Sequence, residues 1–105
     1  MHQDAMNMVR SGLRARIDAL AAQGGTIALP NICEQIDRIR HDACAYGLEP
    51  VARIASTLET ALARNGLGPV ILSYLDVMRD AVECEDNSPE ASTAFLASLS
   101  LRLGH

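Results

Sequence analysis

The sequence contains no tryptophan and no lysine, and its only aromatic residues are Phe95, Tyr46 and Tyr74. A core with so few rings must be built from Leu, Ile, Val, Ala and Met, and this composition favours helices over sheets. No apolar run approaches the ~18 residues needed to span a bilayer, and the N-terminus lacks a basic and then apolar signal segment. We therefore expect a cytoplasmic protein without a membrane segment.

Positive charge is scarce as well. The nine basic residues are all arginines and form no dense cluster, while 13 acidic residues bring the net charge to −4. Nucleic-acid-binding proteins gather basic side chains on one face, so this distribution argues against a nucleic-acid partner. A chain of 105 residues supports one core, and we expect a single domain over residues 1–105.

The three cysteines, Cys33, Cys44 and Cys84, match no zinc-binding or disulfide spacing. Cys33 and Cys44 on one helix would be separated by roughly 16 Å of axial rise. A disulfide requires Cα atoms about 6 Å apart, so these two cannot pair within the chain. We interpret the cysteines as small apolar fillers in a reducing compartment, and we expect neither a metal nor a cofactor.

Glycine and proline divide the chain into five expected helices. The first lies in residues 5–25 and closes at Gly24 and Gly25, and the second runs from an Asn31 N-cap to Tyr46. The third runs from Pro50 to Asn65 and Gly66, and the fourth runs from Pro69 to Glu85. The fifth follows a Ser88 cap, begins at Pro89 and ends at Gly104. Because the connections are short, we predict an all-α, up-and-down four-helix bundle with an additional C-terminal helix against it.

The second expected helix carries an apolar stripe at helical spacing, which must face the core. The stripe consists of Ile32, Ile36, Ile39, Ala43 and Tyr46. We expect Ile32, Ile36, Ile39 and Ala43 to pack against a set of apolar residues from the other helices, namely Leu13, Ile17, Val51, Ile54, Leu58, Ile71, Leu75 and Met78.

The fourth helix is so apolar that we expect it to be the most buried, and its apolar excess leaves homodimer formation as an alternative role. Its acidic residues Asp76, Asp80 and Glu83 are interpreted as a solvent face rather than a metal site.

A different side of the second helix carries Cys33, Asp37, Arg40, His41 and Cys44. Asp37 is spaced to interact with Arg40 at i+3 and with His41 at i+4, pairs worth roughly 0.2–0.5 kcal/mol each. The same residues form a surface that a partner could reach.

From Met8 to about Glu85, the order of helices around "YGLEPVARIASTLETALARNG" resembles a histidine-containing phosphotransfer (HPt) domain. That family is a four-helix bundle that relays phosphoryl groups in two-component signalling. Its second helix carries His, two residues, Lys and Gly, and then a second Gly six residues later before an apolar residue. The resemblance implies a response-regulator receiver domain or a histidine kinase as partner.

Alignment of Gly47 with the family's second glycine puts Asp37 at the phosphoacceptor position, Arg40 at the lysine and His41 at the small glycine. The family reaction needs an imidazole nucleophile, a nearby cation and room for the receiver to approach. An anionic Asp37 repels phosphoryl oxygens, and His41 crowds the approach. We therefore expect a degenerate HPt-like module, not an enzyme, that docks through Asp37, Arg40, His41 and Cys44.

A shifted alignment makes His41 the candidate phosphoacceptor. Ala45 then supplies the small residue, but Cys44 takes the lysine position and Gly47 follows the histidine by six residues instead of ten. Active phosphotransfer through His41 and a structural, homodimerising bundle stay open as alternatives to the docking module.

Overall fold

The computed structural model describes residues 2–23, 28–65 and 71–104, and all of its regular elements in these ranges are α-helices. They are α1 (His2–Gln23), α2 (Leu29–Ala45), α3 (Glu49–Asn65), α4 (Ile71–Glu83) and α5 (Pro89–Arg102). The predicted all-α class is confirmed. None of these helices is long and apolar enough to cross a membrane.

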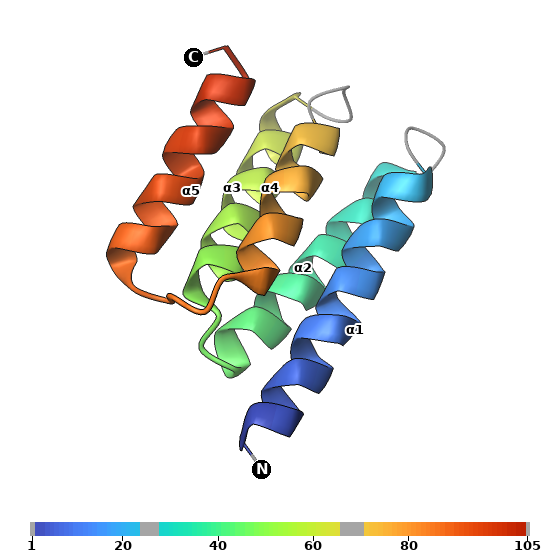
Figure 1. The fold of residues 1–105 in the computed structure, drawn as a ribbon. Coiled ribbons are helices and arrows are strands. Elements are labelled where there is room, and N and C mark those ends of the chain that lie inside the picture. Colours follow the sequence, from blue (N-terminus) through green and yellow to red (C-terminus); the bar gives the residue numbers. More distant parts are fainter. Residues whose placement is uncertain (1, 24–27, 66–70, 105) are drawn as a thin grey trace.

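The helices alternate in direction along the chain, so that α1, α3 and α5 run one way and α2 and α4 the other (Figure 1). α2 packs on α3, α3 on α4 and α4 on α1, whereas α1 contacts α2 only lightly. α5 packs on α3 and α4, on the side of the molecule away from α1 (Figure 1). The outward side of α2 is therefore not covered by α5.

A glycine turn ends α2 and sets the direction of α3. Gly47 has φ +72°, and its backbone N–H donates to the Cys44 carbonyl at 3.2 Å. The Leu48 N–H donates to the Ala43 carbonyl at 2.8 Å, which completes a Schellman motif. In this motif Leu48 is fully buried, while Tyr46 becomes the C-cap and is 51% exposed. The prediction that Tyr46 faces the core is wrong, because the turn brings Leu48 there in its place.

The start of α2 also differs from the prediction. The helix begins at Leu29, its N-cap is Ala28, and no side chain caps it. The Ala28 carbonyl accepts hydrogen bonds from the N–H groups of Asn31 and Ile32 at 3.0 and 3.1 Å. Pro30 lacks an N–H and is favoured inside a first helical turn, so the helix starts before Asn31 rather than at it.

The cap of α5 is confirmed, because the Ser88 side chain accepts from the Ala91 N–H at 3.2 Å. α4 ends at Glu83, two residues before the predicted end. Gly104, with φ +78°, follows the last turn of α5. The expected helix boundaries at Gly24, Gly25, Gly66 and Pro69 lie outside the described residues.

Apart from Tyr46, the predicted core is confirmed. Ile32, Ile36, Ile39 and Ala43 of α2 are at most 1% exposed. All the residues expected to pack against them are buried too, namely Leu13, Ile17, Val51, Ile54, Leu58, Ile71, Leu75 and Met78. In α4, seven of 13 residues are buried, because α1, α3 and α5 all pack on this helix. The apolar excess of α4 is therefore largely accounted for within one chain.

Candidate functional site

The candidate site lies on the outward side of α2, where the sequence predicted it. The side chain of His41 is 66% exposed and that of Asp37 is 48% exposed, and Cys44 is exposed as well. Arg40 lies at the edge toward α3 with its side chain 31% exposed. The period of α2 brings these residues to one side of the helix because its opposite side is used by the core.

Arg40 joins α2 to α3. Its Nη2 donates to Asp37 Oδ1 at 2.6 Å, and its Nε donates to Glu59 Oε1 of α3 at 3.1 Å. One guanidinium is thus shared by two carboxylates, and the three side chains together carry one net negative charge. The sequence predicted the contact with Asp37 but not the contact with Glu59, which depends on how α2 and α3 pack.

The charge states of this cluster follow from its hydrogen bonds. The hydrogen bond from Arg40 holds the pKa of Asp37 below its ordinary value of 3.8, and the nearby His41 ring acts in the same direction. Hydrogen bonds to Asp37 and then to Glu59 raise the pKa of Arg40. At neutral pH, Asp37 is therefore a carboxylate already engaged by a cation.

His41 is held by the backbone of its own helix. Its Nδ1 lies 2.9 Å from the carbonyl oxygen of Asp37 and 3.5 Å from Asp37 Oδ2. A carbonyl oxygen only accepts hydrogen bonds, so Nδ1 carries the proton and donates it. In the neutral ring, Nε2 then keeps its lone pair, on a side chain that is largely in solvent.

The cysteines are all free, and Cys33 is half-buried beside the core, as expected of an apolar filler. Cys44 is exposed, so the interpretation of Cys44 as a filler is wrong. Its place on α2 turns it to solvent because the core side of the helix is fixed by Ile39 and Ala43.

The acidic stripe on α4 lies in solvent as predicted. Asp76, Asp80 and Glu83 are all exposed. Asp76 lies 3.5 Å from Arg102 and Glu83 lies 2.6 Å from Arg14 in ion pairs. Within residues 2–23, 28–65 and 71–104, no group of three or more His, Cys, Asp or Glu side chains could hold a metal ion.

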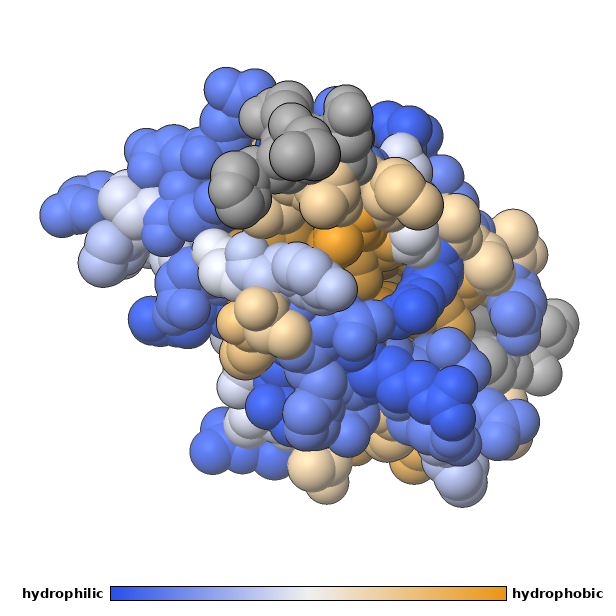
Figure 2. All heavy atoms as spheres, turned by 90° about the horizontal axis from the view of Figure 1, so that it is seen from below, coloured by the Kyte–Doolittle hydropathy of each residue, from blue (hydrophilic) through white to orange (hydrophobic). Residues whose placement is uncertain are grey.

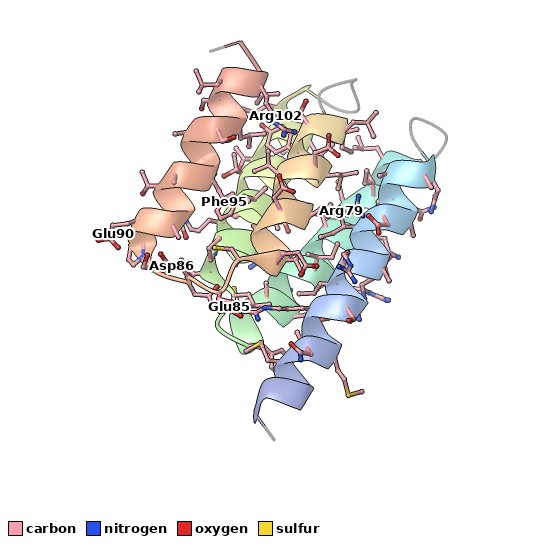
Figure 3. The ribbon with its side chains drawn as sticks, in the orientation of Figure 1. Arg79, Glu85, Asp86, Glu90, Phe95 and Arg102 are labelled. Carbon is pink, nitrogen blue, oxygen red and sulfur yellow. The ribbon has the colours of Figure 1, made fainter. Side chains whose placement is uncertain are left out.

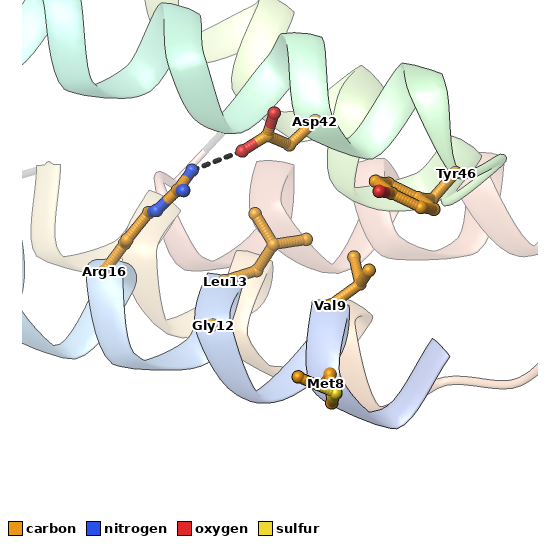
Figure 4. A pocket seen from close by; sticks show the side chains of 7 residues that line it. All are labelled: Met8, Val9, Gly12, Leu13, Arg16, Asp42 and Tyr46. Atoms are coloured by element: carbon orange, nitrogen blue, oxygen red, sulfur yellow. Dashed lines mark hydrogen bonds and ion pairs between the residues drawn. The ribbon is translucent and has the colours of Figure 1, made fainter. Parts of the chain in front are cut away.

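A groove of about 240 Å³ between α1 and α2 was not predicted from the sequence. Seen from below in Figure 2, hydrophobic residues lie at the bottom of a hollow that both hydrophilic and hydrophobic residues border. Figure 4 shows the groove, which is lined by Met8, Val9, Gly12, Leu13, Arg16, Asp42 and Tyr46. An ion pair between Arg16 and Asp42 spans it from α1 to α2. The sequence carried no signal for this groove, because helical periodicity placed its lining residue Tyr46 toward the core.

Comparison of the chain with protein-family models, with curated proteins and with solved structures gives no significant match.

Proposed function

We propose that the chain is an HPt-like signalling module that docks on a response-regulator receiver domain, or on a histidine kinase, without relaying phosphate. The observation that carries the proposal is the outward side of α2, where Asp37, His41 and Cys44 reach solvent. α5 packs on α3 and α4 and leaves this side uncovered. Such a module works in the cytoplasm, where receiver domains are found.

The charges around Asp37 support docking without phosphoryl transfer. The position aligned with the phosphoacceptor holds a carboxylate, which is not a phosphoryl acceptor without strong charge neutralisation. Arg40, the aligned cation, is already shared by Asp37 and Glu59. The cluster therefore offers no surplus positive charge to stabilise an incoming phosphoryl group.

The test of docking combines a binding titration and a phosphotransfer assay against the receiver domains of the same cell. We expect at least one receiver to bind and no phosphoryl group to reach the chain. His41→Glu and Cys44→Glu are expected to weaken binding because both place new charge on the exposed side of α2.

Ala97→Glu is the matched control, because Ala97 is an exposed residue of α5 that is remote from α2 in the fold. It adds the same charge and should leave binding unchanged. Arg40 is less suited to this test, because its replacement would also break the α2–α3 contact with Glu59. Absence of any binding receiver, or equal binding by all three variants, would reject the docking module.

The geometry of His41 favours one second candidate, phosphotransfer through His41 itself. Its Nδ1 donates to the Asp37 carbonyl, which leaves the Nε2 lone pair for attack on an aspartyl phosphate. In that case the same assay would give an acid-labile phosphoryl group on the wild-type chain and none on His41→Gln. That result would replace the docking proposal by an active relay.

A further inference from the structure

A second groove, of about 330 Å³, opens between α4 and α5. α5 packs more extensively on α3 than on α4, so the two antiparallel helices α4 and α5 are not fully closed on one another. Most of the lining is apolar: Val77 comes from α4, Cys84 directly follows it, and Ala91, Ala94 and Phe95 come from α5. In Figure 3, Phe95 extends from α5 toward α4.

The two ends of this groove differ in charge. An ion pair between Arg102 of α5 and Asp76 of α4, 3.5 Å apart, links the helices at the end near the C-terminus of α5. At the opposite end, Figure 3 places Glu85 and Asp86 along the connection from α4 to α5 and Glu90 at the start of α5, on its side away from α4.

Asp80 brings a further carboxylate into the lining of the groove. Asp80, Glu85 and Glu90 make no ion pair with any residue in the described part of the chain. Asp86 accepts a hydrogen bond from the Ser88 N–H at 3.0 Å and meets no basic side chain there. The groove thus contains one carboxylate without a basic partner, Asp80, and the segment at its end, from Glu85 to Glu90, carries three more.

We propose that the α4–α5 groove binds a basic amphipathic helix from a partner protein. A groove between two helices accepts the apolar side of a third helix, with anchors at i, i+3, i+4 and i+7. Lysine or arginine beside those anchors would meet Asp80 in the lining and Glu85 and Asp86 at its end, and Glu90 would add to the negative potential there. A second copy of this chain is disfavoured, because it would bring a net charge of −4 to an acidic border.

The proposal is tested with a fluorescein-labelled Leu/Lys peptide of about 18 residues whose leucines follow the helical spacing. Its binding to the full chain is measured by fluorescence anisotropy at low and physiological salt. We expect saturable binding that weakens as salt rises, since screening reduces attraction between exposed charges. A scrambled peptide of the same composition and a Leu/Glu peptide should each bind at least about tenfold more weakly.

Two sets of variants separate the groove from general attraction to acidic surface. Ala94→Gln puts a neutral, bulky side chain on an exposed position of the groove and should weaken binding about tenfold. Ala97→Gln makes the same change on an exposed position of α5 outside the lining and should have no effect. Circular dichroism of both variants verifies that they fold.

Glu85→Lys with Glu90→Lys should also weaken binding about tenfold, and more at low salt than at high salt. The matched control reverses two exposed acidic residues of α2 and α3, Glu34→Lys with Glu49→Lys, and changes the net charge equally. Equal binding of the ordered and scrambled peptides, equal effects of Ala94→Gln and Ala97→Gln, or equal effects of the two charge reversals would overturn the proposal. The peptide assay does not measure receiver binding, so its failure can be distinguished from a failure of the receiver-docking test.

Discussion

At the scale of single residues, Gly47 and Gly12 have different backbone roles. Gly47 has φ +72°, a conformation that costs an L-residue about 1–2 kcal/mol. Gly12 lies inside α1, where an added Cβ would meet no atom within 4 Å. We expect Gly47→Ala to lower the free energy of unfolding by about 1–2 kcal/mol and Gly12→Ala to raise it by about 0.5–1 kcal/mol. Urea unfolding followed by circular dichroism measures both, and a shift of equal sign in the two variants would contradict these backbone assignments.

The Asp37–Arg40 pair predicts a pH dependence of stability. The pKa of Asp37 is lowered from 3.8 in the folded chain, chiefly by its hydrogen bond from Arg40. A lowered carboxyl pKa contributes stability that is present above pH 3.8 and is lost as pH falls through the folded-state value. We expect wild type to be more stable than Asp37→Asn at neutral pH, with the difference vanishing in acid below pH 3.8.

Unfolding free energies of the two chains, measured by urea titration across this pH range, check that expectation. The control repeats the comparison in an Arg40→Gln background, where the main cause of the lowered pKa is removed. The pH-dependent difference should shrink strongly there. A difference that persists unchanged without Arg40 would show that another group stabilises the carboxylate.

The outward direction of Asp37 and His41 could be predicted because helical periodicity alone fixes it. The sharing of Arg40 with Glu59 could not, since the two residues are 19 positions apart and meet only through α2–α3 packing. The tautomer of His41 likewise depends on a hydrogen bond to the Asp37 carbonyl that periodicity allows but does not require. The sequence of a helix predicts on which side of it a side chain lies. The residues of other helices that this side chain contacts depend on how the helices pack.

At the scale of helices, the apolar stripe of α2 and the facing side of α3 carry much of the core. Ile39 and Leu58 are at most 1% exposed. We expect Ile39→Ala and Leu58→Ala each to lower the free energy of unfolding by about 2–5 kcal/mol, through lost burial and a residual cavity. Leu101 is 78% exposed, so Leu101→Ala is the control and should stay within about 0.5 kcal/mol. Chemical unfolding compares all three, and a small loss in both core variants would reject the predicted core side.

Helix interiors were more predictable than helix ends. The 3.6-residue period located the buried stripe of α2 correctly from Ile32 to Ala43. At its start, Asn31 is a favourable N-cap residue and Pro30 is a favourable first-turn residue, and the two predict different first residues for the helix. The structure has the start that Pro30 favours, with Ala28 as the N-cap. At its end, the period continues to Tyr46, but the left-handed Gly47 breaks it and turns the chain so that Leu48 is buried. Periodicity cannot represent such a change of direction.

At the scale of the whole molecule, short connections correctly suggested that neighbouring helices run antiparallel (Figure 1). The sequence did not predict which neighbouring helices pack closely and which pack lightly. Both the α1–α2 groove and the α4–α5 groove open where neighbouring helices pack lightly. Lateral spacing depends on side-chain volumes across several helices at once, and no single amphipathic pattern records it.

The light contact of α1 with its neighbour α2, and its closer packing on α4, also affects how the chain folds. α2 and α3 meet across a short turn, so their association closes only a small loop. α1 instead packs mainly on α4, which begins only at Ile71, so this association closes a much longer loop. During synthesis on a ribosome, α1 therefore emerges well before α4. Until α4 has been made, the apolar residues Leu13, Ile17 and Leu20 of α1 are exposed to solvent and to chaperones.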